Sequence, residues 1–137
     1  DLHTFMAAYL KVDYGQRGNQ PGPNLVGVEF MTPAVTSATL IDYLKGLLPS
    51  AEFEALRRED AREPSRFLFE NLARKTNPHI HFFNSQEWGY SIVEFTREHT
   101  TYTAYSVEKS TNAATAAKRL IRRIRVPVNR IEFVDIV

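Results

Sequence analysis

Four polar residues at two points of the chain have types and spacings that suit metal or phosphate chemistry. Asp1 and His3 are two residues apart, so on an extended segment both side chains point to one side, within reach of one metal ion or phosphate. Asn77 and His79 flank Pro78, which keeps Asn77 out of the helical backbone region. An amide oxygen is a hard, neutral ligand for a divalent cation. Structural alternatives remain open: a solvated acid and histidine, and an asparagine that ends a helix.

Two further groups invite a chemical interpretation but have simpler explanations. His79 and His81 share one face of a predicted strand, which suits a metal pair, although such residues are more often half-buried in a sheet. Residues 118–130 contain six Lys or Arg and no acid, and guanidinium groups bind phosphate in bidentate fashion. Apolar residues are interleaved with these cations, so a solvated sheet edge or helix face explains the segment more simply.

Composition excludes several classes of protein. The 137 residues are 43% hydrophobic, with 17 Lys+Arg against 16 Asp+Glu, which is typical of a folded domain and argues against a disordered chain. We expect no nucleic-acid partner, because such domains usually carry a clear basic excess. No apolar run approaches about 18 residues, so no transmembrane segment is expected. The absence of cysteine excludes disulfides and a thiol nucleophile.

Periodicity and turn residues predict a chain of alternating strands and helices around these candidate residues. Residues 4–14 form a short buried segment, and the Gly- and Pro-rich residues 15–23 form a loop. Apolar spacing predicts helices over 39–48, 50–58 and 65–75. Strand-like segments cover 25–31, 79–84, 89–96, 100–107 and 131–137, and the second to fourth of these look like a meander. Residues 118–126 fit a helix or a strand.

Taken in order, four segments resemble one known family. They are Asp1-Leu-His-Thr-Phe-Met-Ala-Ala-Tyr-Leu-Lys11, Val28-Glu-Phe-Met-Thr-Pro-Ala-Val-Thr-Ser37, Asn77-Pro-His-Ile-His-Phe-Phe-Asn84 and Trp88-Gly-Tyr90. In this order they resemble the PhoD-like alkaline phosphatase and phosphodiesterase group of metallophosphoesterases. The family's motif has a glycine before the residue matched by Asp1. His81 and Glu87 stand where relatives often carry Lys or Arg, so phosphate contacts in this part depart from the family pattern.

The resemblance implies a fold and a site. The fold is α/β: the C-terminal portion of a four-layer α/β/β/α sandwich with a mixed sheet, a helical insert over about 39–75 and a strand-rich part over about 79–137. Asp1 and Asn77 would be ligands of a multinuclear centre of calcium, iron, manganese or zinc. His3 and His79 would be catalytic residues beside the substrate phosphate, positioning or protonating the leaving oxygen.

The implied function is metal-dependent hydrolysis of phosphate monoesters or diesters, in a secreted or periplasmic enzyme. A centre of two or more metals needs about seven ligands, more than this chain offers, so the remaining N-terminal part of the same enzyme is the expected partner. We therefore expect the isolated 137 residues to be inactive. The alternative is a non-catalytic binding domain that uses the basic segment 118–130 to engage an anionic partner, with salt-dependent affinity.

Overall fold

A computed structural model describes residues 2–59, 67–109 and 115–137. The metal ligand predicted at Asp1 therefore lies outside the described residues. The helices are α1 (Leu40–Leu44), α2 (Ser50–Leu56) and α3 (Leu68–Thr76). The strands are β1 (Phe5–Lys11), β2 (Leu25–Met31), β3 (Ile80–Asn84), β4 (Trp88–Phe95), β5 (His99–Val107), β6 (Lys118–Pro127) and β7 (Val134–Asp135).

The strands form two sheets. One has the order β2-β1-β3 and the other the order β4-β5-β6-β7. Every strand pair in the described ranges is antiparallel, so the expectation of a mixed sheet is wrong. The α/β class holds in its broad sense, because the chain has both helices and strands. The predicted meander is correct for β4 and β5. It is wrong for β3, which pairs with β1 and not with β4. Residues far apart in the sequence therefore lie on neighbouring strands.

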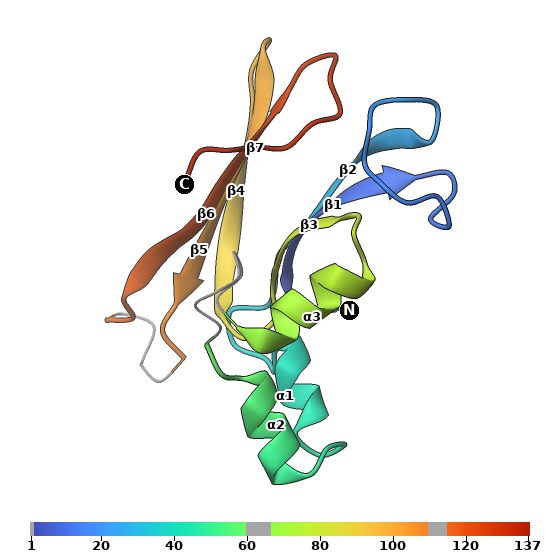
Figure 1. Cartoon of the computed structure of the whole chain (residues 1–137). Coiled ribbons are helices and arrows are strands. Elements are labelled where there is room, and N and C mark those ends of the chain that lie inside the picture. Colours follow the sequence, from blue (N-terminus) through green and yellow to red (C-terminus); the bar gives the residue numbers. More distant parts are fainter. Residues whose placement is uncertain (1, 60–66, 110–114) are drawn as a thin grey trace.

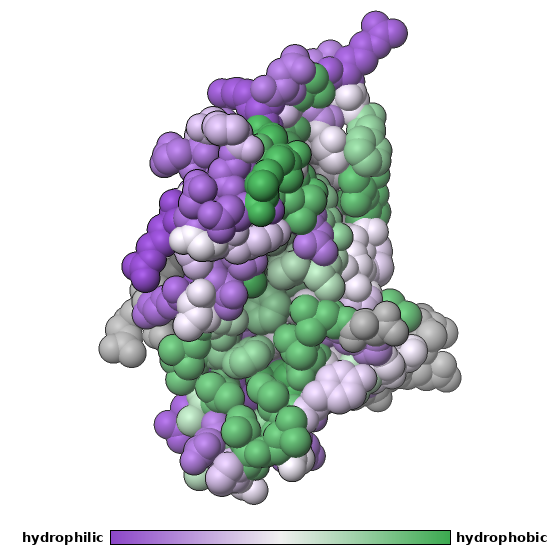
Figure 2. Space-filling model, turned by 90° about the vertical axis from the view of Figure 1, so that its right-hand side faces the viewer, coloured by the Kyte–Doolittle hydropathy of each residue, from purple (hydrophilic) through white to green (hydrophobic). Residues whose placement is uncertain are grey.

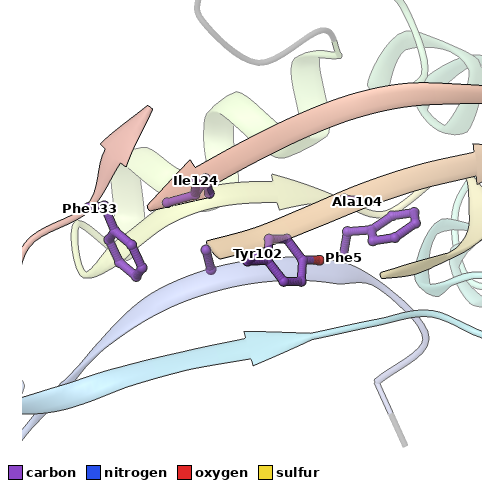
Figure 3. Close-up of a cluster of buried hydrophobic side chains, with 6 residues drawn as sticks. Phe5, Tyr102, Ala104, Ile124 and Phe133 are labelled. Atoms are coloured by element: carbon purple, nitrogen blue, oxygen red, sulfur yellow. The ribbon is translucent and has the colours of Figure 1, made fainter. Parts of the chain in front are cut away.

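The two sheets pack face to face, and the main core lies between them (Figure 1). Because side chains alternate along a strand, Phe5 and Ala7 of β1 point toward the second sheet, where Tyr102 and Ala104 of β5 meet them. Ile124 and Phe133 complete the buried cluster shown in Figure 3. The ring of Tyr102 stacks on Phe30 of β2 at 4.6 Å between ring centres, which joins β5 to the first sheet.

Helix α3 covers the other face of the three-stranded sheet, and α1 and α2 lie at the end of the sheet (Figure 1). Phe69 and Ala73 of α3 pack on Met6, Ala8 and Phe83, so the order of layers is helix, sheet, sheet (Figure 1). The helical side of the molecule still shows much apolar surface, above all toward α1 and α2 (Figure 2). Exposed apolar side chains on and next to the helices are Tyr43, Leu47 and Leu72.

Both sheets have an edge strand on one side of the sandwich. β2 pairs only with β1, and β4 pairs only with β5. The hydroxyl groups of Thr32, which follows β2, and Ser91, in β4, are hydrogen-bonded, so the two edges lie next to each other. Val26 and Phe95 on these strands are 57% and 79% exposed.

Three predicted elements differ in extent from the observed ones. The first predicted helix, 39–48, ends at Leu44, since Gly46 and Pro49 follow and both disfavour helix. The ambiguous basic segment is the ten-residue strand β6, in which pairing with β5 outweighs the helical spacing of its apolar residues. The final strand predicted over 131–137 is limited to the two residues of β7.

Candidate metal and phosphate site around His3

A surface hollow lies where β1 begins and β2 ends. His3 lies two residues before Phe5, the first residue of β1, and Met31 is the last residue of β2. The hollow has a volume of about 390 Å³ and is lined by Leu2, His3 and residues 31–34. The antiparallel pairing of β1 with β2 creates it, because that pairing places the start of one strand beside the end of the other.

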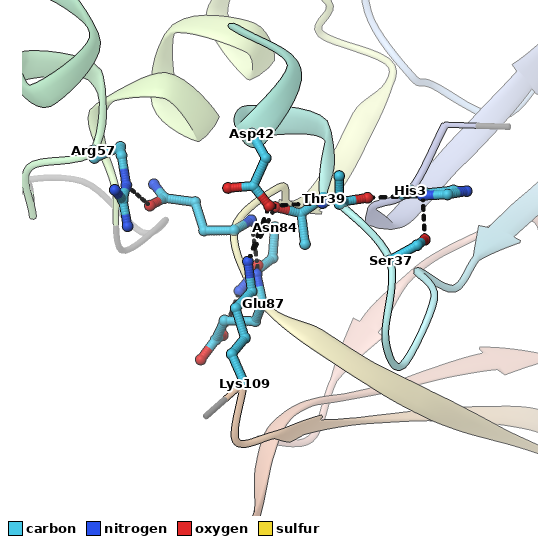
Figure 4. A network of polar contacts seen from close by, with 10 residues as sticks. His3, Ser37, Thr39, Asp42, Arg57, Asn84, Glu87 and Lys109 are labelled. Carbon is cyan, nitrogen blue, oxygen red and sulfur yellow. Dashed lines mark hydrogen bonds and ion pairs between the residues drawn. The ribbon is translucent and has the colours of Figure 1, made fainter. Parts of the chain in front are cut away.

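His3 is held through one nitrogen of its ring. Nδ1 lies 2.7 Å from the carbonyl oxygen of Ala38 and 2.9 Å from the hydroxyl oxygen of Ser37 (Figure 4). A carbonyl oxygen can only accept a hydrogen bond, so Nδ1 carries the proton and donates it. In the neutral ring Nε2 is then the nitrogen with the lone pair, available to a metal ion or a proton.

The loop that holds His3 is fixed by α1. The backbone N–H of Leu40 donates to the carbonyl of His3 at 2.9 Å. Thr39 is fully buried, and its backbone N–H and hydroxyl both donate to Asp42, at 2.9 and 2.8 Å. Lys109, which follows β5, lies 3.3 Å from the same carboxylate (Figure 4).

These contacts determine the charge of Asp42. Burial opposes ionisation, but the hydrogen bonds from Thr39 and the ammonium group of Lys109 outweigh it and hold the pKa of Asp42 below its ordinary value. The carboxylate therefore stays charged at neutral pH, where it caps the first turn of α1.

A buried phenol supports the end of β2 beneath the hollow. Tyr102 is fully buried, and its hydroxyl donates to the carbonyl of Met31 at 3.0 Å. Burial raises the pKa of this phenol above its ordinary value, so it remains a neutral donor at neutral pH. The wall of the hollow formed by β2 is thus tied to β5.

The turn between β3 and β4 is a second polar cluster at the same end of the sheets. Asn84 Oδ1 accepts from the backbone N–H groups of Gln86 and Glu87, and its Nδ2 donates to Glu87 at 2.6 Å. Glu87 also forms an ion pair with Arg119 of β6. Glu87 therefore holds the guanidinium group of Arg119 at this end of the sheets.

The other predicted site residues lie at the opposite end of β1. The backbone N–H of Tyr9 donates to the carbonyl of His79 at 2.9 Å, so His79 lies level with Tyr9. His3 is six residues earlier, and at about 3.3 Å per strand residue the separation along the strand is about 20 Å. Metal–ligand distances are only about 2.0–2.6 Å. The structure therefore does not bring His3 and His79 to one ion.

Asn77 and His79 have structural roles at that end. The Asn77 amide nitrogen donates to the carbonyl of Ala73 at 2.9 Å, which satisfies the last turn of α3, the alternative left open in the sequence. The ring of His79 packs edge-on against Tyr14 at 4.8 Å. Burial, with a smaller contribution from Lys11, lowers the pKa of His79 below its ordinary value.

The histidine pair at 79 and 81 is separated by a bulge in β3. Ala7 pairs with Phe82 and Ala8 with Ile80, so His81 is the extra residue. Its Nε2 lies 3.0 Å from Asp135, and its ring stacks on Phe133. His81 thus joins β3 to β7, and we assign it no metal.

The basic segment is partly neutralised by acids within the fold. Arg119 pairs with Glu87, Arg122 with Asp135 at 2.7 Å, and Arg130 with Glu132 at 3.5 Å. The alternation of β6 puts Arg123 and Arg125 on the sheet face away from the core residue Ile124. The binding of an anionic partner would depend on those two cations and on Lys118, which lies over the ring of Tyr105.

Sequence reasoning missed the groups that hold His3. Ser37 belongs to the second resembling segment, but its contact with His3 spans 34 residues, and nothing in the local sequence indicates it. Glu70 was also missed. It is 1% exposed and accepts hydrogen bonds from the backbone and hydroxyl of Ser85, which anchors the β3–β4 turn to α3.

Comparison with known proteins gives no match: no family model, no curated protein and no solved structure matches the chain. Within residues 2–59, 67–109 and 115–137, no three His, Asp or Glu side chains gather closely enough to hold a metal ion. None of the helices in these ranges has the length and apolar character that crossing a membrane requires.

Proposed function

We propose that this chain forms part of a metal-dependent phosphoesterase that hydrolyses phosphate monoesters or diesters, with its share of the active site at His3. The observation that carries the proposal is the arrangement of the His3 ring, which donates from Nδ1 to a backbone carbonyl at the edge of a hollow of about 390 Å³. Metal-binding histidines almost always donate their second ring N–H in this way, which fixes the ring and raises the basicity of the other nitrogen.

Among the described residues, His3 would supply one ligand of a metal centre. His3 would hold the ion through Nε2. Asp1 is two residues before it in the sequence, and further carboxylates would come from the N-terminal part of the same enzyme. A bound metal would lower the pKa of a coordinated water toward about 7 and neutralise charge on the phosphoryl oxygens. The chain's own part is to orient His3 and to form the β2 wall of the hollow.

The order of layers also supports this proposal. Helix, sheet and sheet are three layers of the four-layer sandwich that the resemblance implies, and the face of β4–β7 that points away from the core is where a fourth, helical layer would pack. The resemblance is the only support for a secreted or periplasmic location. Asn77 and His79 take no part in the proposed site, because His79 lies about 20 Å from His3 along β1 and the Asn77 amide is bonded to the last turn of α3.

Paramagnetic Mn²⁺ tests the location of the site on the 137-residue chain itself. We expect Mn²⁺ added to ¹⁵N-labelled protein to broaden the amide resonances of residues 2–4, Met31, Thr32 and Ala34 first. His3→Ala should abolish this broadening, whereas His79→Ala, the matched control at the far end of β1, should leave it unchanged. Broadening centred on residues 77–80, or none that depends on His3, contradicts the assignment.

Turnover tests the reaction. In the protein that includes the N-terminal part, His3→Ala should reduce hydrolysis of p-nitrophenyl phosphate and bis-p-nitrophenyl phosphate by about 10²-fold or more, because removing even a partner that orients a metal ligand typically costs 10–100-fold. His79→Ala should retain activity. Equal activity of the two variants would refute the proposed function.

A further inference from the structure

A second hollow lies at the opposite end of the sheets from His3. It has a volume of about 310 Å³ and forms between the loop before β2 and the connection from β6 to β7, away from α1 and α2 (Figure 1). Leu25 in its wall pairs with Lys11, eight residues after His3, which is about 26 Å along the strand. What this hollow binds is therefore independent of the proposed function. Its lining consists of Pro21, Gly22, Leu25 and residues 129–132.

The wall before β2 is held in place by a buried lysine. Lys11 is 9% exposed, and its ammonium group donates to the backbone carbonyls of Gln16 and Gly18. Burying an ammonium group is costly unless its donors are bonded, so these contacts fix the course of the loop. The N–H of Leu25 also donates to the carbonyl of Gly22, at 3.1 Å.

The wall after β6 is fixed at both of its ends. The N–H of Arg130 donates to the carbonyl of Pro127 at 3.3 Å, which closes a turn with Asn129 at a φ of 66°. The N–H of Phe133 donates to the hydroxyl of Tyr9 at 3.2 Å, and the two rings pack at 4.5 Å between centres. Both walls are thus built before any ligand arrives, as is usual for small-molecule sites.

The lining combines apolar side chains with a few polar groups. Pro21, Leu25 and Ile131 supply apolar surface, and small-molecule sites of about 300–1,000 Å³ are typically lined in this way. Within the described ranges, the N–H groups of Ile131 and Glu132 donate to no backbone carbonyl, unlike those of the residues on either side. Two consecutive amide donors in an apolar hollow favour a ligand that brings an acceptor.

Arg130 adds a positive charge at the same place. It lies 3.5 Å from the carboxylate of Glu132, whereas a charge-assisted hydrogen bond is about 2.7–2.9 Å long. Both side chains are largely exposed, and such ion pairs contribute little. A guanidinium group has five N–H donors, so Arg130 can bind a second carboxylate or exchange Glu132 for it.

We propose that this hollow binds a small organic acid with an apolar body. The apolar body lies against Pro21, Leu25 and Ile131, and the carboxylate accepts hydrogen bonds from the Ile131 and Glu132 amides and from Arg130. The site needs no metal and no reaction, and it lies too far from His3 for one small molecule to reach both.

A titration of the ¹⁵N-labelled 137-residue chain tests the ligand class. The probes are 3-phenylpropionate and its neutral analogue 3-phenylpropionamide. We expect the acid to shift the amide resonances of Gly22, Leu25 and residues 129–132 in a saturable way. The neutral amide should bind about threefold more weakly, the usual size of an exposed charge interaction.

Two variants with matched controls test the location. A Cβ at Gly22 would meet no atom within 4 Å, and the extended backbone imposed by Pro23 suits leucine, so Gly22→Leu should fold and fill the hollow. It should weaken binding of the acid about tenfold or more, the contribution of one buried apolar group. Gly46→Leu, between α1 and α2 and equally free of contacts, should bind like wild type.

Charge removal gives a readout that does not depend on filling the hollow. Arg130→Gln should weaken binding of the acid about threefold and leave binding of the neutral amide unchanged. Arg125→Gln, which removes an exposed cation elsewhere, should change neither.

Several results would overturn the proposal. They are saturable shifts outside these two segments, no saturable shift at all, unchanged affinity of a folded Gly22→Leu variant, and equal binding of the acid and the amide. Binding of the peptide N-acetyl-Leu-Leu-amide without binding of the acid would also overturn it, because the hollow would then belong to a protein partner.

Discussion

Gly89 in β4 lies against Phe5 of the other sheet, and a single methyl group there tests the packing between the two sheets. A Cβ at this position would lie 2.0 Å from the carbonyl oxygen of Tyr105 and 2.6 Å from Cζ of Phe5. The first contact is with backbone of the neighbouring strand, which cannot rotate away. The second is with a fully buried ring in the main core.

The size of the effect follows from these contacts. Overpacking a core typically costs 1–3 kcal/mol, and a clash with backbone belongs at the upper end, so we expect Gly89→Ala to lower the free energy of unfolding by about 3 kcal/mol. For a domain of this length each kcal/mol corresponds to roughly 3–5 °C. The expected decrease in Tm is therefore about 10 °C.

Urea denaturation measures this change, followed by circular dichroism and by the fluorescence of Trp88, the single tryptophan and the direct neighbour of Gly89. Gly27→Ala in β2 is the matched control. Its Cβ would meet only Leu10 Cδ1, at an ordinary 3.6 Å, so a change within about 0.5 kcal/mol is expected. Equal midpoints for the two variants would mean that β4 does not lie against Phe5 as described.

Two further predictions concern a buried hydrogen bond and a titrating side chain. Tyr102→Phe keeps the stacking on Phe30 but removes the donor to the Met31 carbonyl, so we expect a loss of about 1 kcal/mol in the free energy of unfolding by urea titration; no loss would contradict the bond. The pKa of His79 is lowered in the folded state, so the unfolded chain takes up the proton first as pH falls below about 6.5, and stability decreases there. His79→Gln, which does not titrate, should flatten the fall in stability between about pH 7.5 and 5.5. An unchanged slope would argue against a buried His79.

Much of the fold is predictable from local sequence. The β-branched and aromatic run at 25–31 and the turn residues at 15–23 gave β2 and its preceding loop correctly. The partner of β3 could not be predicted, because a local pattern indicates that a segment is extended but does not indicate which strand it pairs with. The local pattern left residues 118–126 open between helix and strand for the same reason, since pairing with β5 decides the conformation.

The candidate site was predictable only in part. The spacing of Asp1 and His3 draws attention to a histidine that lines the hollow, but the groups that contact its ring are 34 and 35 residues away and follow from tertiary structure. Grouping Asn77 and His79 with His3 relied on their order in the resembling segments. The same order in the sequence also fits residues at opposite ends of two paired antiparallel strands. Only the register of β1 with β3 shows that His3 and His79 lie at opposite ends.

The neighbouring edge strands β2 and β4 leave one side of this sandwich open to the addition of a further strand. On its opposite side, Asp135 bonds to both His81 and Arg122 and fastens the sheets together. On the β2 and β4 side, backbone groups and apolar side chains such as Phe95 face outward without the lysines and prolines that usually discourage strand addition. A strand added at either of these edges would extend the sheet that it joins.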